Sequence, residues 1–213
     1  MNEDIEFVNQ STRIEKLKNF IIKNRKNLIL TFLSIIVFLF VLFIYQEFQE
    51  KKKLDIAEKF NNLTLVKIKK GEKDKLEKLI EIIASQNETY SILSLNYIID
   101  NQLIDDKSKI NKLFDDTIKI QSDNEIKNLI IYKKGLFNSD NIDENELLKI
   151  LNPVLKSQSV WKPHSLLLMS DYFYANGNSI KSKQFLKEIV GSEKINNNIK
   201  LEAEKRLRRY FNE

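Results

Sequence analysis

The side chains that could carry out catalysis or bind a metal are few in this sequence. His164 is the single histidine and there is no cysteine, so a Cys–His dyad or a metal site built on these residue types cannot form. The four glycines are isolated from one another, which leaves no G-x-G-x-x-G or G-x-x-x-x-G-K phosphate loop. We therefore expect no catalytic, cofactor-binding or metal-ligating residues, no cofactor and no enzyme activity.

Neighbouring acidic residues are the other candidates for acid–base chemistry. Adjacent residues on a helix point about 100° apart, so two neighbouring carboxylates do not converge on one substrate atom. We expect these pairs to be solvated surface charges or charges in the first turn of a helix. The pairs are Asp105-Asp106, Asp115-Asp116 and Asp143-Glu144.

His164 and Trp161 belong to one short stretch around Pro163. Because proline favours the first turn of a helix, His164 is expected near a helix start, as a surface or capping group. Trp161, the only tryptophan, either lines a partner site or packs against Pro163 and the next helical hairpin. Burial of large aromatic side chains is the general rule and favours packing.

The composition points to an all-α protein. Turns in β-sandwiches and barrels draw on glycine and proline, and the chain has four Gly and two Pro in 213 residues. Short apolar stripes at helical spacing recur from Leu76 to Phe211, joined by polar links. Ser122 or Asp123, Asp140 and Ser179 are expected N-caps.

Residues 28–45 form an apolar stretch of 18 residues without a charge, Gly or Pro. At about 1.5 Å per residue a helix of this length reaches roughly 27 Å, close to the hydrocarbon thickness of a bilayer. No small-residue cleavage site follows it, which argues against a signal peptide. We predict a cytoplasmic juxtamembrane tail at 1–27, a transmembrane helix at 28–45, and a helix that continues from about Leu28 to about Lys70.

The orientation follows from six Lys or Arg residues before the apolar stretch against four in the flank after it. The positive-inside rule then favours an N-terminus in the cytoplasm. After residue 45 the chain carries 29 basic and 26 acidic residues, interspersed along the sequence. Nucleic-acid-binding domains concentrate their positive charge, so we expect no nucleic-acid partner.

A helix–turn–helix pattern near the end carries a repeat signature. Ser170 and Ser182 occupy positions where tetratricopeptide repeats place small residues, so that two helices approach closely. Phe173 falls at the aromatic position, Gly177 at the turn, and Leu186 at the large apolar position. Residues 46–213 are therefore predicted to form a tetratricopeptide-like solenoid of helical hairpins.

The order of parts resembles the bacterial ancillary SecYEG translocon subunit family, of the YfgM type. Residues 7–17 are similar to its charged juxtamembrane helix, and Ala57 and Phe60 match its post-membrane stretch. Further similarity covers 89–95, 151–155, Trp161 and 166–186.

The resemblance implies a single-pass protein of the bacterial inner membrane, with its repeat domain in the periplasm. It implies protein partners, namely the Sec translocon and a periplasmic chaperone, and no small-molecule substrate. A scaffold or regulatory protein whose repeat domain faces the cytoplasm stays open as the alternative, because the count of flanking charges is close.

Overall fold

The computed structural model describes residues 15, 16, 18–65 and 73–212, and within these ranges it contains helices and no strands. The all-α prediction is confirmed for this part of the chain. The predicted juxtamembrane helix at 7–17 lies mostly outside the described residues. The helices are α2 (Arg25–Thr64), α3 (Lys73–Ala84), α4 (Glu88–Asp100), α5 (Lys107–Ile120), α6 (Asn124–Asn138), α7 (Glu144–Leu155), α8 (Lys162–Ala175), α9 (Ser179–Gly191) and α10 (Asn197–Phe211).

Helix α2 contains the whole apolar stretch. It runs for 40 residues with no buried residue, and it passes from Tyr45 to Asp55 without a break. The prediction of one continuous helix is thus confirmed as far as Thr64; residues 66–72 lie outside the described part. By length and composition α2 is able to cross a membrane.

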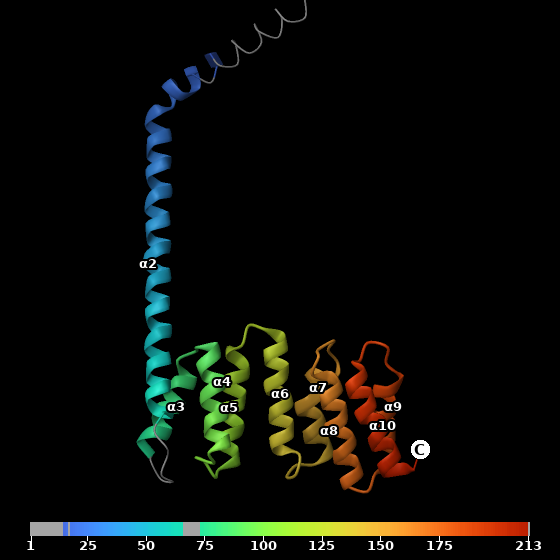
Figure 1. Ribbon diagram of the computed structural model, residues 1–213. Helices are drawn as coiled ribbons and strands as arrows, with labels where there is room; N and C mark the ends of the chain where they lie inside the picture. Colours follow the sequence, from blue (N-terminus) through green and yellow to red (C-terminus); the bar gives the residue numbers. More distant parts are fainter. Residues whose placement is uncertain (1–14, 17, 66–72, 213) are drawn as a thin grey trace, which may run out of the picture. The chain divides into compact units, whose positions relative to one another are not determined.

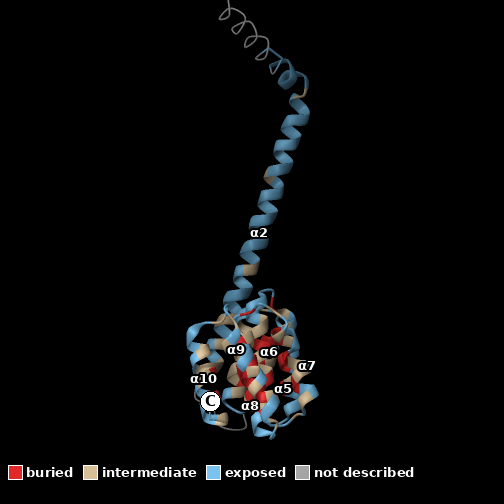
Figure 2. Cartoon of the chain, turned by 90° about the vertical axis from the view of Figure 1, so that its right-hand side faces the viewer, coloured by how far each residue is buried: buried red, intermediate tan, exposed pale blue. Residues whose placement is uncertain are grey.

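Residues 56–213 form a compact unit that includes the last turns of α2. Each helix from α3 to α10 packs on the next, and α4 to α8 stand side by side in chain order (Figure 1). The buried residues gather in the interior of this unit (Figure 2). Three apolar clusters make up this core, at α3–α6, α7–α9 and α8–α10.

The even-numbered helices form one row, which we call the even row: residues 56–64, α4, α6, α8 and α10. The Phe60 ring lies 5.6 Å from that of Tyr90, which joins α2 to α4. The Lys133 ammonium donates to Asn96 Oδ1 (2.9 Å), which joins α6 to α4. Helices α6 and α8, and α8 and α10, are in direct contact.

Two close approaches set how tightly the helices pack. The Oγ atoms of Ser170 and Ser182, on α8 and α9, lie 2.9 Å apart in the core. A Cβ built on Gly135 would lie 2.5 Å from Leu151 Cδ2, so α6 and α7 touch where α6 has no side chain. Between α8 and α9, Gly177 has φ +76°, a left-handed conformation that glycine adopts without strain, as the predicted turn requires.

Some local predictions were wrong. Asp123 caps α6 as expected, but Asp143 rather than Asp140 caps α7, and Asn178 rather than Ser179 caps α9. Each observed cap accepts a hydrogen bond from a backbone N–H of the first turn, and this geometry depends on where the loop ends.

The apolar residues of α6 do not all face the core. Ile126 and Leu136 are 38% and 52% exposed, while the buried residues of α6 are Ile130, Ile131, Gly135 and Asn138. Glycine and asparagine occupy half of the inward positions, so the apolar periodicity of the sequence does not follow the buried face.

Candidate partner-binding surface

Side chains suited to binding a protein are distributed unevenly between the two rows of helices. Every tyrosine after Tyr45 belongs to an even-numbered helix: Tyr90 and Tyr97 on α4, Tyr132 on α6, Tyr172 and Tyr174 on α8, and Tyr210 on α10. Tyrosine combines a large apolar ring with a hydroxyl, and it is enriched at protein interfaces for that reason.

Exposed apolar side chains follow the same row. In the described part of the chain after α2, α3, α5 and α7 carry no exposed large hydrophobic residue. The even-numbered helices α4 to α10 carry Leu93, Ile126, Leu136, Tyr174 and Leu201. Outside this row, Leu65 is exposed directly after α2, Ile180 at the start of α9 and Val160 in the loop before α8. A concentration of apolar surface on one side of a domain marks a site of association.

Three aromatic rings meet where α6 passes the start of α8. The Tyr132 ring stacks on Trp161 at 5.9 Å and 20°, and His164 lies 5.9 Å from Tyr132 and 5.3 Å from Trp161. All three residues are half-buried. Burial lowers the pKa of His164 from 6.5, which favours the neutral ring, and burial likewise raises the pKa of Tyr132.

This arrangement corrects the expectation for His164. The N-cap residue of α8 is Trp161, whose side chain makes no capping hydrogen bond, and His164 belongs to the aromatic cluster. The ring partners of Trp161 are His164 and Tyr132, the latter from the preceding helical pair. Tyr132 was not identified from the sequence as a candidate residue. Its position could have been noticed, because the tyrosines after Tyr45 all lie on alternate helices.

The loop before α8 is fixed by hydrogen bonds that position Trp161. The Ser159 hydroxyl donates to Glu125 Oε2 (2.7 Å), and the same carboxylate oxygen accepts from the Val160 backbone N–H (3.2 Å). The Trp161 backbone N–H in turn donates to Ser159 Oγ (3.1 Å). Glu125 at the start of α6 thereby ties this loop to the even row.

Charged and aromatic side chains connect α8 to α10. The Arg206 guanidinium pairs with Asp171 and also donates to Glu202 Oε1 (3.1 Å), and the Tyr210 hydroxyl donates to Asp171 Oδ1 (3.2 Å). The Tyr210 ring stacks on Tyr174 with centroids 3.8 Å apart. Burial, followed by the charge of Asp171, raises the pKa of Tyr210. Arg206 thus balances the charge of Asp171, and the stacked Tyr174 and Tyr210 rings extend the aromatic surface onto α10.

A hollow of about 760 Å³ opens beside Trp161, and we call it the Trp161 hollow. The loop before α8, the end of α9 and the start of α10 enclose it. Its apolar lining comes from Val160, Trp161, Ile195 and Ile199, and its charged lining from Lys162, Lys187, Lys194 and Glu188. Val160 is 66% exposed, so an apolar ligand group has open access to this lining.

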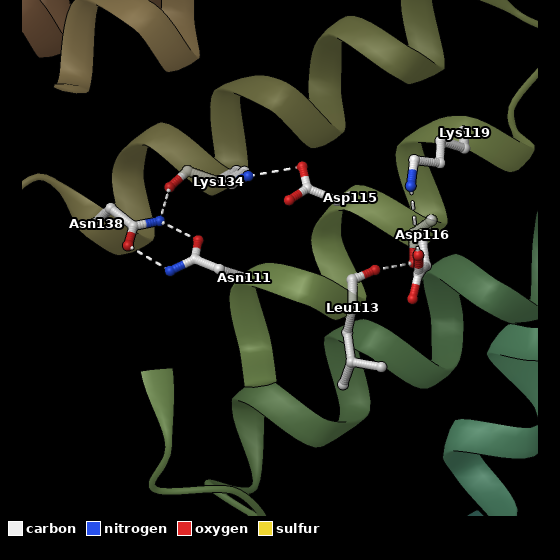
Figure 3. A network of polar contacts seen from close by, with 8 residues as sticks. Asn111, Leu113, Asp115, Asp116, Lys119, Lys134 and Asn138 are labelled. Atoms are coloured by element: carbon white, nitrogen blue, oxygen red, sulfur yellow. Dashed lines mark hydrogen bonds and ion pairs between the residues drawn. The ribbon is translucent and has the colours of Figure 1, made fainter. Parts of the chain in front are cut away.

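Polar side chains of α5 and α6 pair with one another across the contact between these two helices (Figure 3). The side-chain amides of Asn111 and Asn138 exchange two hydrogen bonds, of 2.9 and 2.8 Å, and the Lys134 ammonium donates to Asp115 (2.7 Å). Polar groups satisfied in this way hold α5 against α6.

The acidic pairs do not form two-carboxylate sites. Asp115 pairs with Lys134, whereas Asp116 lies 3.8 Å from Lys119. The members of the other pairs also act separately: Asp106 and Asp143 are N-caps, and Glu144 pairs with Lys181. Within the described residues, no group of three His, Cys, Asp or Glu is placed to hold a metal ion.

In comparisons with known proteins, no family model, curated protein or solved structure matches the chain.

Proposed function

We propose that this chain is a membrane-anchored helical-repeat protein that binds other proteins through its even row. Residues 28–45 are the anchor, and residues 56–213 are the binding domain. One observation carries the proposal: tyrosines and exposed apolar side chains concentrate on alternate helices, while α3, α5 and α7 lack both. Exposed apolar surface is costly in water, and covering it by a partner recovers that free energy.

The repeat architecture supports this role. In a solenoid of helical hairpins, alternate helices line one extended surface, and the side chains exposed on it select partners. Close packing through Ser170 and Ser182, and through Gly135, holds α8 against α9 and α6 against α7. The contacts of α6 with α4 and of α8 with α6 and α10 make the surface of the even row continuous.

The resemblance to the ancillary SecYEG translocon subunit family supports a particular setting for the proposal. In that setting the N-terminus is cytoplasmic, the repeat domain is periplasmic, and the chain is an accessory subunit of the Sec translocon and periplasmic chaperone network. A membrane anchor raises the effective concentration of the domain near membrane-bound partners, so even modest affinity suffices.

Purification of the full chain from detergent-solubilised membranes tests the identity of the partners. We expect translocon subunits or a membrane-anchored chaperone to be recovered with the wild-type chain, and less with Leu136→Glu/Tyr174→Glu. Lys109→Glu/Lys112→Glu, on α5, introduces the same number of acidic residues off the even row and should change nothing. Recovery of cytoplasmic proteins alone would contradict the periplasmic setting.

The orientation is tested separately with reporters fused after Glu213. Activity of a phosphatase that folds only in the periplasm is expected. Fluorescence of a reporter that matures only in the cytoplasm would support the alternative, a scaffold or regulatory protein facing the cytoplasm, and the close count of flanking charges motivates this comparison.

A further inference from the structure

The C-terminal helices differ in charge from the rest of the repeat unit. Residues 179–212 carry nine Lys or Arg and four Asp or Glu, whereas residues 73–178 carry 13 basic and 16 acidic residues. The positive charge of the domain is therefore concentrated on α9, α10 and the loop between them. We call residues 179–212 the basic end.

The Trp161 hollow lies where the basic end meets the aromatic cluster. Lys187 on α9 and Lys194 in the loop before α10 line it from the basic end, and Lys162 lines it from α8. Glu188 is the acidic residue in this lining, and it pairs with Lys162 at 3.4 Å. The hollow thus combines an apolar wall with an excess of positive charge.

We propose that the partner segment bound at this end of the even row is an acidic peptide that places one apolar side chain in the Trp161 hollow. The inference rests on the proposed function and specifies the chemistry of the partner. Carboxylates of the peptide face Lys194 and the neighbouring basic side chains of the basic end, and the apolar group packs between Trp161 and Ile199. Burial of the apolar group supplies affinity, and charge complementarity supplies selectivity and a faster encounter.

An extended acidic peptide suits this lining better than a nucleic acid does. The hollow has apolar walls beside its charged side chains, and one of these side chains, Glu188, is itself a carboxylate. A phosphate backbone would bring negative charge along the whole contact and leave the apolar wall of Val160, Ile195 and Ile199 uncovered.

The position of the only tryptophan makes binding directly measurable. Full-length protein in detergent is titrated with a tryptophan-free peptide of about twelve residues, made of Glu and Ser with one central Phe. We expect a saturable change in Trp161 fluorescence and a Kd that rises roughly tenfold between about 50 mM and about 500 mM salt, because salt screens the charges. The same peptide with Lys in place of Glu, or Ser in place of Phe, should bind at least roughly tenfold more weakly.

Two matched double variants test whether the peptide binds at the Trp161 hollow. Lys194→Glu/Lys200→Glu, in the loop before α10 and at its start, should weaken binding roughly tenfold or more. Lys109→Glu/Lys112→Glu makes the same change in net charge on α5 and should leave the Kd unchanged. Circular dichroism checks that both variants keep their helices, and anisotropy of a labelled peptide measures binding independently of Trp161.

Several results would overturn the inference. Binding seen by anisotropy without a change in Trp161 fluorescence would put the site elsewhere, and equal weakening by the two variants would make the attraction non-specific. Tighter binding of duplex DNA, or of a short-chain phosphatidylglycerol, at the same salt would identify a different class of ligand. If proteins crosslink to the even row but the acidic peptide does not bind, this inference fails and the proposed function stands.

Discussion

Ser170 and Ser182 share a single hydrogen bond in the core, with their Oγ atoms 2.9 Å apart and both side chains fully buried. The pair lies where α8 crosses α9, the two helices of one hairpin. Only small side chains allow this approach, and each hydroxyl satisfies the other in a place that water does not reach. The contact therefore combines close packing with a buried hydrogen bond in which each hydroxyl needs the other as its partner.

The first prediction is that the two serines are energetically coupled. Ser170→Ala should lower the free energy of unfolding by about 1–3 kcal/mol, because Ser182 keeps a buried hydroxyl without its partner. The double variant Ser170→Ala/Ser182→Ala should cost less than the sum of the two single variants, since it leaves no unpaired group. Urea denaturation in detergent, followed by Trp161 fluorescence, measures all three.

Ser108→Ala, at an exposed position of α5, serves as the control and should change the stability by less than about 0.5 kcal/mol. Strict additivity of the two core variants would show that the hydrogen bond contributes nothing.

The second prediction concerns Gly135. Alanine is the better helix former by about 1 kcal/mol, yet Gly135→Ala should destabilise the domain by about 1–3 kcal/mol, because the new Cβ meets Leu151 at 2.5 Å. Adding Leu151→Val, which removes one methylene, should recover part of the loss. Thermal unfolding followed by circular dichroism provides the comparison.

Gly191→Ala is the matched control, because nothing lies within 4 Å of the Cβ position of Gly191 at the end of α9. It should be neutral or stabilising. If both glycine variants behaved alike, close packing of α6 on α7 would not be the cause.

Gly135 also illustrates what the sequence could predict. Where the inward positions are apolar, as in Ile110, Leu113 and Phe114 of α5, the apolar spacing in the sequence coincides with the buried face of the helix. In α6 two inward positions are Gly135 and Asn138, and Ile126 and Leu136 point outward to the candidate surface. Periodicity assumes that apolar side chains face the core, and a binding surface violates that assumption.

The partner-binding surface was the least predictable feature. The numbers of basic and acidic residues over residues 46–213 are nearly equal, so the total does not reveal the excess of basic residues in the basic end at 179–212. The contact of Trp161 with Tyr132, and that of Arg206 with Asp171, join helices about 30 or more residues apart in sequence, and local patterns do not encode such pairs.

The third prediction concerns pH. Burial holds the pKa of His164 below 6.5, so the unfolded chain takes up a proton there before the folded chain does. Stability from this group is complete above pH 6.5 and is lost as the pH falls through the lower pKa of the folded ring. Between about pH 7.5 and about pH 5.5 the melting temperature should decrease.

His164→Gln should remove much of that decrease, and the interpretation is simple because His164 is the single histidine. A wild-type melting temperature that rose on acidification, or an equal decrease in the variant, would count against burial of a neutral ring.

The fourth prediction concerns the apolar half of α2. Val37→Arg/Phe38→Arg should release the chain from membranes, because each arginine at the centre of a spanning helix costs about 2.5–3.5 kcal/mol. Phe48→Arg/Leu54→Arg places the same charges outside the 28–45 stretch and should keep the chain in the membrane. Flotation of membranes on a sucrose gradient separates inserted protein from aggregates. Equal flotation of both variants would refute residues 28–45 as the anchor.

Photocrosslinking in intact cells tests the central claim, binding of proteins through the even row, most directly. A photoreactive amino acid is placed at Leu136 on α6 or Tyr174 on α8, which are 52% and 40% exposed, and at Lys112 on α5 or Lys149 on α7 as exposed controls. We predict adducts with the same partner proteins from Leu136 and Tyr174, and none of these adducts from Lys112 and Lys149. Equal adducts from both rows, or adducts from α5 and α7 alone, would contradict the claim.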